Sequence, residues 1–422
     1  MSNKIRGGIN GKYLLCLLLI LLLVGFFIWK QNYGVIGHVT GITGSTAGEL
    51  VFVKQSQDGK TELFMVRGDG SGLQMITADG LSKRMPAWSP DGRQICYAGE
   101  SKGENSRTFQ LFLLGSGSPQ QLTSGSTGKD SPLWSSNGKQ IAFLSGGAIK
   151  VINPNGAALS QIYPPPHKGG NQSDEDQTPE ALHLPPIGSL KWAPGAATIA
   201  AIQILEGENA PAMGQSDWWN KTPDTTSSGQ EFILPEGILL LPGLDVKPLM
   251  IPMAMATRAS FDWMPDSTRI VAALSGQGQV HRIAIFRMDD VKLPSQDVFL
   301  AKQYTVAAEN PTVSPDGTRV AFELWRMSSS EDRELLGISQ LPLDSLAPVI
   351  IRSASDIPKL QMLIKGHASE PHFSPDGKKL LYTIAGPKGR DICVSNADGS
   401  NVINLTKGQG DCFNAVWSPA LK

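Results

Sequence analysis

From residue 49 onward, short runs of alternating apolar and polar residues are separated by turn residues. The stretch PAWSPDGRQICYA, residues 86–98, shows the pattern. Trp88 lies in one run, and Ile95 and Tyr97 share one face of the next, as side chains do along a strand. Between the runs SPDG favours a turn, because Pro presets φ, Asp bonds nearby backbone and Gly accepts a positive φ. The stretch therefore predicts two antiparallel strands, and FQLFLL and PQQLT after it predict a third and a fourth.

This phrase recurs along the chain at a variable spacing. It aligns on seven apolar anchors that lie 44 to 71 residues apart: Trp88, Trp134, Trp192, Trp263, Val313, Phe373 and Trp417. A repeat of roughly 40 to 60 residues with strand-like content predicts a β-propeller. We expect an all-β fold of seven four-stranded antiparallel blades, or six if the degenerate copy at 190–250 forms no blade. No helix is expected after residue 30.

The two ends of the repeat region complement each other. Residues 49–77 predict a second, a third and a fourth strand, whereas the last copy, AVWSPALK, supplies only a first strand. We therefore expect one blade to be shared by the two ends. Such a blade closes the ring and removes exposed sheet edges.

The N-terminal region has a different pattern. Tyr13 to Trp29 are 17 residues without a charge, which as a helix would be about 26 Å long, slightly less than a hydrocarbon core. Three basic residues precede the run and only Lys30 closely follows it, so the positive-inside rule places the N-terminus in the cytoplasm. The bulky residues after the run, FFIWKQNYG, differ from a signal-peptide cleavage site and favour an uncleaved signal anchor over a cleaved leader.

The expected domain organisation follows from these patterns. It consists of a cytoplasmic N-terminus (1–12), a transmembrane signal anchor (13–29), a flexible linker (30–48) and the propeller (49–422). A propeller that follows such an anchor lies outside the cytoplasm, at the outer side of the inner membrane. The expected location is therefore a single-pass inner-membrane protein with its propeller in the periplasm.

Composition excludes several classes of function. The formal net charge is −1 and the pI is near 6.6, so no basic surface for nucleic acid is indicated. The four cysteines, Cys16, Cys96, Cys393 and Cys412, are too few and too scattered for a disulfide framework or a cysteine-based zinc site. No cofactor is expected.

The repeated WSPDG and FSPDG phrases, with VSNADGSNVINLT near the C-terminus, resemble the WD-like "PD" repeats of the TolB-like propeller family. The resemblance covers roughly residues 49–422. The α/β domain that accompanies the propeller in TolB itself is not expected, because only the linker precedes the first strands. Related propellers occur in dipeptidyl peptidases and in oligogalacturonate lyases, so the resemblance implies the fold and leaves the function open.

The loops that lead into the first strands are the main candidate site, because in a propeller they converge on one mouth of the central channel. They carry a ring of mixed charge: Arg84, Asp130, Arg258, Glu309, Asn310, Glu370, Asp411 and Asn414. No nucleophile and base are paired among them. This ring suits a polar peptide or a protein terminus better than a reaction, and it predicts a non-enzymatic protein-interaction scaffold with a protein or peptide partner outside the cytoplasm.

Other motifs keep two alternatives open. Trp218 and Trp219, adjacent in a polar insertion, predict either a contact with a partner or sugar or packing onto the rim. His367, Glu370 and His372 are weak candidates for a metal site, as in a propeller lyase or hydrolase that acts on a sugar polymer. A ligand-binding sensor is the other alternative. GESKG at 99–103 matches a nucleophile-elbow pattern but lacks the helix that the elbow requires, so it predicts a hairpin loop.

Overall fold

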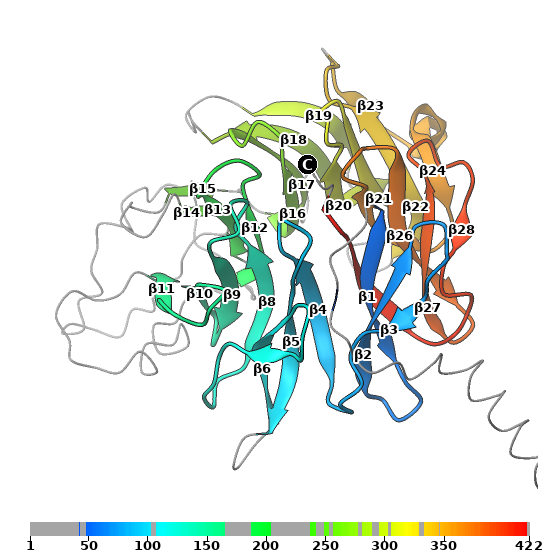
Figure 1. The fold of residues 1–422 in the computed structure, drawn as a ribbon. Helices are drawn as coiled ribbons and strands as arrows, with labels where there is room; N and C mark the ends of the chain where they lie inside the picture. The colour runs from blue at the N-terminus through cyan, green and yellow to red at the C-terminus, as the bar shows by residue number, and fades with distance from the viewer. Residues whose placement is uncertain are drawn as a thin grey trace, which may run out of the picture.

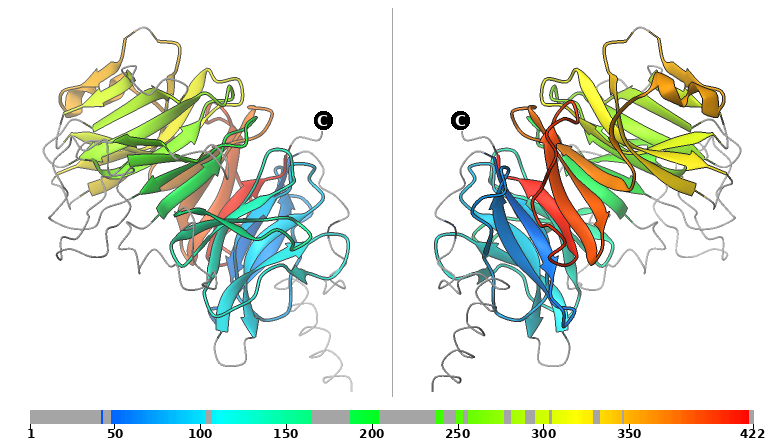
Figure 2. Two further views of the ribbon diagram at one scale, coloured as in Figure 1. Left: turned by 90° about the vertical axis from the view of Figure 1, so that its left-hand side faces the viewer. Right: turned by 90° about the vertical axis from the view of Figure 1, so that its right-hand side faces the viewer.

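The computed structural model describes residues 42, 48–102, 107–164, 187–203, 237–241, 249–252, 256–276, 281–288, 295–302, 305–328, 333–345 and 347–419. These residues form seven antiparallel sheets placed around a common axis (Figures 1 and 2). Within them, no helix has the length and apolar character needed to cross a bilayer. The expected anchor at 13–29, the N-terminus before it and most of the linker lie outside the described residues.

The first four blades follow the chain from its N-terminal end. Blade 1 contains β29 (Cys412–Trp417), β1 (Glu49–Gln55), β2 (Thr61–Arg67) and β3 (Gln74–Met75). Blade 2 contains β4 (Lys83–Trp88), β5 (Ile95–Lys102), β6 (Arg107–Leu114) and β7 (Gln120–Gln121). Blade 3 contains β8 (Lys129–Trp134), β9 (Ile141–Ser145), β10 (Ala148–Ile152) and β11 (Ser160–Tyr163). Blade 4 contains β12 (Ile187–Trp192), β13 (Ile199–Gln203), β14 (Gly237–Leu241) and β15 (Leu249–Pro252).

The last three blades are built in the same way. Blade 5 contains β16 (Ala256–Trp263), β17 (Arg269–Gly276), β18 (His281–Arg287), β19 (Gln296–Ala301) and β23 (Val349–Ile351). Blade 6 contains β20 (Val306–Val313), β21 (Arg319–Met327), β22 (Arg333–Pro342) and β24 (Gln361–Lys365). Blade 7 contains β25 (Ala368–Phe373), β26 (Lys379–Gly386), β27 (Gly389–Asn396) and β28 (Ile403–Asn404). The seven-bladed prediction is confirmed, and the degenerate copy at 190–250 forms blade 4.

Blade 1 is shared by the two ends of the chain, as predicted. Strand β29 pairs antiparallel with β1, with Leu50 opposite Trp417 and Val53 opposite Phe413. The ring is therefore closed by backbone hydrogen bonds between segments more than 350 residues apart. The blue and red strands that meet in Figure 1 are this blade.

One feature departs from a ring of uniform blades. The segment after β22 runs to blade 5, where β23 adds a fifth strand parallel to β19. It then forms η2 (Ala354–Lys359), a 3₁₀ helix, before returning as β24. The expectation of no helix after residue 30 is wrong here, because Asp356 accepts the N–H groups of Arg352 at 2.8 Å and Ser353 at 3.3 Å and so caps this turn.

The anchor residues explain why Trp recurs. Four indole groups donate across a seam to the carbonyl that precedes the anchor of the neighbouring blade: Trp134 to Ala87 at 3.1 Å, Trp192 to Leu133 at 3.0 Å, Trp263 to Lys191 at 3.1 Å and Trp417 to His372 at 3.2 Å. A Trp at this position therefore fills the space between two sheets and also hydrogen bonds across it.

The SPDG turns combine a local and an inter-blade role. In blade 6 the Ser314 hydroxyl donates to Asp316 at 2.5 Å and accepts the Arg319 N–H at 3.0 Å, and the turn glycine Gly317 has φ +72°. A Cβ placed on Gly317 would lie 3.4 Å from Pro265 of blade 5. The same contact recurs between Gly138 and Pro90 and between Gly377 and Pro315. The Pro of one turn therefore packs against the Gly of the next.

Candidate functional site

The inner strands begin at the end of the ring opposite to the SPDG turns, and we call this end the mouth. Each blade contributes its first strand: β4, β8, β12, β16, β20, β25 and β29. Five of these strands carry a left-handed residue three positions before the anchor, with φ between 50° and 55°: Met85, Ser131, Asn310, Glu370 and Asn414. A non-glycine residue in this region costs of order 1–3 kcal/mol and often marks a functional site. Three of the predicted mouth residues occupy this position.

The pairing register shifts at the same place. In blade 7 the shift lies between Ser369 and His372, so Glu370 leaves the ladder and its strand bends. Blades 4 and 5 differ, because their register shifts lie earlier, before Ser189 and before Arg258. The sequence analysis assigned residues to the mouth but contained no signal for this bulge.

Arg84 and Asp130 are brought together by neighbouring inner strands. Arg84 Nη2 lies 2.6 Å from Asp130 Oδ2, and the two side chains are 37% and 30% exposed. The guanidinium also lies 3.8 Å from the ring centre of Phe109 in β6. The arginine is thus held by a carboxylate on one side and an aromatic face on the other.

Two further arginines are held in the same manner. Arg333 contacts Glu309 at 2.6 Å and lies 4.0 Å from the Trp325 ring. Arg390 contacts both oxygens of Asp411, at 2.9 and 2.8 Å, and lies 4.4 Å from the Phe413 ring. Sequence reasoning found the acids but missed both arginines, because they begin third strands and not first strands. We call the three arrangements the arginine clamps.

A buried carboxylate joins blades 6 and 7 at the mouth. Glu323 in β21 is 2% exposed and accepts the Asn310 side-chain amide at 2.9 Å, the Glu370 backbone N–H at 2.8 Å and the Trp325 indole at 3.1 Å. Three donors offset the cost of burying this carboxylate. Glu323 therefore positions two predicted mouth residues, and it was not predicted because it lies within a second strand.

The pKa values of two mouth acids are shifted in opposite directions. Burial raises the pKa of Glu370, with Glu323 and Asp411 adding to the rise and the Arg390 guanidinium opposing it. The hydrogen bonds from Arg390 lower the pKa of Asp411. Burial thus favours the protonated form of Glu370, whereas the Arg390 guanidinium favours the ionised form of Asp411.

Three residues that directly precede an anchor, Lys191, Asp262 and His372, form a second polar group on the inner strands. Lys191 Nζ lies 2.9 Å from Asp262 Oδ1, and the other oxygen of Asp262 accepts the Val313 N–H at 2.9 Å. His372 lies on the inner strand β25, directly before the anchor Phe373. Loss of hydration there, with Lys191 nearby, lowers the pKa of His372 to about 4, and Asp262 opposes the shift. His372 is therefore neutral at pH 7.

The metal candidates gain no support from this geometry. Across the described part of the chain, no three His, Cys, Asp or Glu side chains lie close enough to hold a metal ion. His367 precedes β25, whereas Glu370 and His372 lie within it. Trp218 and Trp219 lie outside the described residues, as does the Arg258 side chain, of which only the backbone register opposite Ser275 is described.

Threonines at the ends of the fourth strands secure the loops that enter the mouth. In blade 7 the Thr406 hydroxyl donates to Asp391 at 2.8 Å and accepts the Ile392 N–H at 3.0 Å, and Asp391 also accepts the Gly408 N–H at 2.8 Å. Thr77 with Glu62 and Thr123 with Gln110 repeat the arrangement in blades 1 and 2. The mouth loops are thus fixed by side chains of the blades that precede them.

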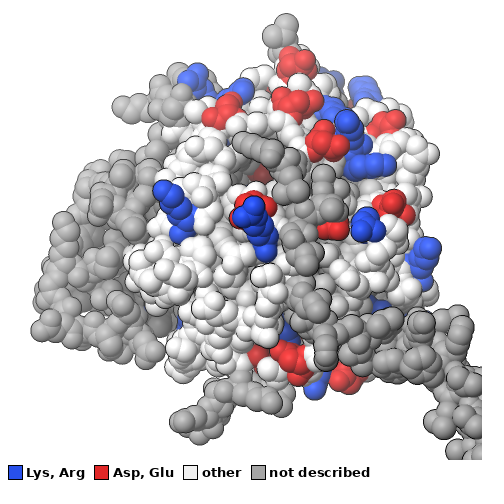
Figure 3. Space-filling view, viewed as in Figure 1, with Lys and Arg blue, Asp and Glu red and all other residues white. Residues whose placement is uncertain are grey.

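Opposite charges lie side by side on the molecular surface. Figure 3 shows basic and acidic residues next to each other at several places on one face. This distribution agrees with the ion pairs of the arginine clamps. It indicates specific pairing and not a general attraction for a polyanion.

Seven blades, six of them with four strands and one with a fifth strand added, are closed by a strand from the C-terminus and define this protein as a seven-bladed β-propeller. No model of a known protein family matches the chain, and no curated protein matches its sequence. Solved structures do match, and they show the propeller fold. The propeller fold that the resemblance of the repeats implied is confirmed by the seven sheets and by these matches.

Three similar structures illustrate the range of propellers. A puromycin-hydrolysing peptidase from Mycobacterium tuberculosis has a TM-score of 0.54 at 14% identity, over 86% of this chain and 52% of the peptidase. An oligogalacturonate lyase from Vibrio parahaemolyticus has a TM-score of 0.50 at 12% identity, over 87% of each chain. TolB from Acinetobacter baumannii has a TM-score of 0.46 at 14% identity, over 88% of this chain and 83% of TolB. This chain thus spans about half of the peptidase, and at such identities the likeness extends to the fold alone.

Proposed function

We propose that the protein is a non-enzymatic protein-interaction scaffold whose mouth binds an extended polar segment of a partner protein. The observation that carries this proposal is the set of three arginine clamps in blades 2, 6 and 7. They come from separate parts of the ring and share one end of it. Several contacts of moderate strength can therefore act on one extended ligand.

The clamps provide oriented donors. A guanidinium carries five N–H donors in one plane, and a carboxylate uses only one or two of them. The stacked ring of Phe109, Trp325 or Phe413 fixes the plane, so little side-chain entropy remains to be lost on binding. The remaining donors suit backbone carbonyls or carboxylates of a peptide. Each charge-assisted hydrogen bond contributes about 1.5–3 kcal/mol when well formed.

The cellular setting is part of the same proposal. The apolar run at 13–29, with basic residues before it, supports a single-pass anchor in the inner membrane and a propeller on the extracytoplasmic, periplasmic side. Protease added to spheroplasts is then expected to digest the propeller or to release it by cutting the linker. Protection of the propeller until the cells are lysed would contradict this orientation.

The test of binding uses two ion pairs of equal length at opposite ends of the ring. Arg84 and Asp130 form the mouth pair, and Arg269 and Asp266 form a pair beside an SPDG-type turn, each with a 2.6 Å contact. Affinity capture from membrane extracts, with quantification of the captured proteins, compares Arg84→Glu with Arg269→Glu. We expect Arg84→Glu to lose a partner that wild type and Arg269→Glu retain, with unchanged melting temperatures. Equal capture by all three proteins would exclude the mouth as the binding surface.

The alternatives are a propeller lyase or hydrolase that acts on a sugar polymer and a ligand-binding sensor. The likeness to the oligogalacturonate lyase is one of fold, and the described residues offer no metal-binding group. Metal analysis of the purified protein separates the lyase from the scaffold. A stoichiometric bound metal would favour the lyase.

A further inference from the structure

The seam between blades 1 and 2 differs from its neighbours at the anchor position. Trp88 is 8% exposed, yet its indole nitrogen is buried and has no hydrogen-bond partner among the described residues. The four other anchor tryptophans each donate to a carbonyl across a seam. The equivalent acceptor for Trp88 is the carbonyl of Val416 in the closing strand β29. The seam between blades 1 and 2 therefore lacks the indole bond that four other seams have.

A residue from outside the repeat fills this seam. Ile42, which precedes the first strand, is 3% exposed and belongs to the same apolar cluster as Trp88, Leu63 and Leu114. Its backbone N–H also donates to the Gly115 carbonyl at 2.7 Å, at the end of β6. Ile42 thus contacts blade 2 through its backbone and the core of the seam through its side chain.

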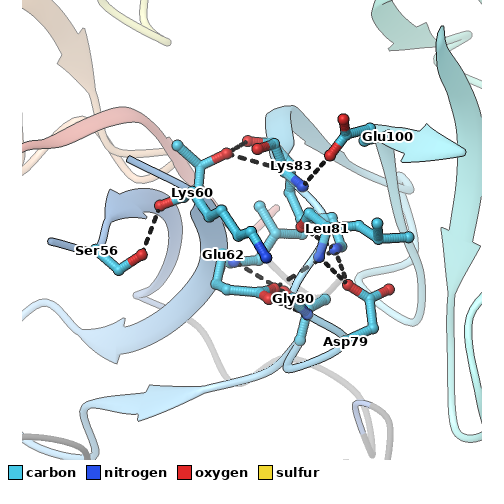
Figure 4. A network of polar contacts seen from close by, with 12 residues as sticks. Ser56, Lys60, Glu62, Asp79, Gly80, Leu81, Lys83 and Glu100 are labelled. Carbon is cyan, nitrogen blue, oxygen red and sulfur yellow. Dashed lines mark hydrogen bonds and ion pairs between the residues drawn. The ribbon is translucent and has the colours of Figure 1, made fainter. Parts of the chain in front are cut away.

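The mouth end of the seam is held by polar contacts instead (Figure 4). The Thr61 hydroxyl in β2 donates to the Lys83 carbonyl at 2.6 Å and accepts the Lys83 N–H at 2.8 Å. The Lys83 side chain is 2% exposed and its ammonium contacts Asp79 and the Leu81 carbonyl, with Glu62 3.6 Å away. The seam is therefore tied at the mouth by this network and at the other end by Ile42.

We propose that Ile42 is a latch that closes the seam between blades 1 and 2, so that release of Ile42 and loosening of this seam are one event. The latch compensates for the indole bond that Trp88 does not make. Release of Ile42 would also reach the mouth residues on β4, since β4 forms one wall of the seam. This inference stands on the packing alone and does not require the proposed partner.

Hydrogen exchange of the full-length protein tests the latch. In Ile42→Ala, amides of β1, β2 and β5 are expected to exchange roughly tenfold faster than in wild type, while those of β17 and β21 keep their rates. The matched control is Ile350→Ala, which truncates a 36%-exposed isoleucine of β23 and should change neither set. Unchanged exchange in β1, β2 and β5, or an equal rise in all blades, would overturn the proposal.

A graded variant keeps the test valid if Ile42→Ala folds poorly. Ile42→Val retains most of the side chain and should give exchange rates in blades 1 and 2 between those of wild type and Ile42→Ala. Removal of a methyl group by Val is small enough to leave the fold intact. Wild-type rates at the seam in Ile42→Val, together with general unfolding of Ile42→Ala, would assign Ile42 to overall stability and exclude a local latch.

Discussion

The two ends of the ring are built on opposite principles. At the SPDG end the same residues recur, with a Ser–Asp contact in each of blades 2, 6 and 7 and Ser–Asn in blade 3. At the mouth the equivalent positions hold Met85, Ser131, Asn310, Glu370 and Asn414, which share a backbone conformation but no chemistry. Repetition of side chains marks the end that holds the ring together. At the mouth the backbone conformation repeats while the side chains vary, as the proposed recognition of a partner requires.

The two ends also differ in how they shift the pKa of a carboxylate. At the SPDG end, hydrogen bonds from Ser314 and from the backbone and hydroxyl of Thr318 lower the pKa of Asp316 to about 2. At the mouth, burial raises the pKa of Glu370. The turn around Asp316 stabilises the ionised form of its carboxylate, whereas burial of Glu370 disfavours the ionised form. Shifted pKa values of the second kind are common at functional sites.

The largest expected effect comes from opening the ring. Deletion of residues 415–422 removes the second half of β29 and leaves Leu50 and Val51 of β1 without their partners across the shared blade. The core of blade 1 is then exposed at an open edge, so stability should fall by about 5 kcal/mol, as much as a domain commonly has. Solubility and thermal melting report the loss. The control deletes 167–180, a polar insertion between repeats, and should have little effect. Similar melting of the two truncated proteins would contradict closure through blade 1.

The next largest effect compares a seam that has an indole hydrogen bond with the seam between blades 1 and 2, which has none. Trp134→Phe removes an indole donor and leaves the Ala87 carbonyl without its partner, which is expected to cost about 1–3 kcal/mol. Trp88→Phe removes the same atoms from a side chain that is equally buried but makes no such bond, so it should cost less. Denaturant unfolding of both variants measures the difference. Equal losses would show that the indole bond adds nothing to packing.

A smaller effect tests the SPDG turn. Gly317→Ala places a side chain at φ +72°, which costs about 1 kcal/mol, whereas Gly117→Ala meets nothing within 4 Å and requires no positive φ. Both glycines lie in turns at the same end of the ring. The midpoint of denaturant unfolding should fall for Gly317→Ala alone. A fall of the same size in Gly117→Ala would mean that the turn conformation is not the cause.

The smallest effect is in the pH dependence, and its sign differs between the two ends. The lowered pKa of Asp316 contributes stability above its unfolded value near 4, and this is lost as the pH falls toward 2. The raised pKa of Glu370 contributes stability at low pH, which is lost as the pH rises through its folded value. Asp316→Asn should therefore weaken the fold slightly at pH 7, and Glu370→Gln should not. Melting temperatures of both variants and of wild type from pH 3 to 7 measure this difference. Equal losses of stability in the two variants at pH 7 would contradict the assignment.

The sequence predicted the parts of the fold that local chemistry determines. Trp88 and the SPDG turn after it identify a strand and a hairpin without any knowledge of the neighbours, and the unmatched strands at 49–77 and 415–422 reveal closure. The inter-blade contact of Pro265 with Gly317 was not predictable, because it depends on two turns that are 50 residues apart. The 3₁₀ helix at 354–359 was missed because it lies within an irregular excursion between blades.

The site was predicted in part for the same reason. Position in the repeat was enough to assign Arg84, Asp130, Glu309 and Asp411 to the mouth. Their partners Arg333 and Arg390 lie on third strands and join the acids only through the geometry of the blades. Position in the repeat thus identified which acids lie at the mouth, but it did not reveal that arginines from the same or a neighbouring blade hold them.

Photo-crosslinking in cells tests the central claim most directly. A photoreactive amino acid replaces Met85, which lies at the mouth and is 36% exposed, or Lys139, which is exposed beside the turn of blade 3. The account predicts a discrete crosslinked protein at position 85 that is absent at position 139 and is lost in Arg84→Glu. A partner crosslinked at position 139 and not at position 85 would place recognition at the repeated end of the ring and contradict the account.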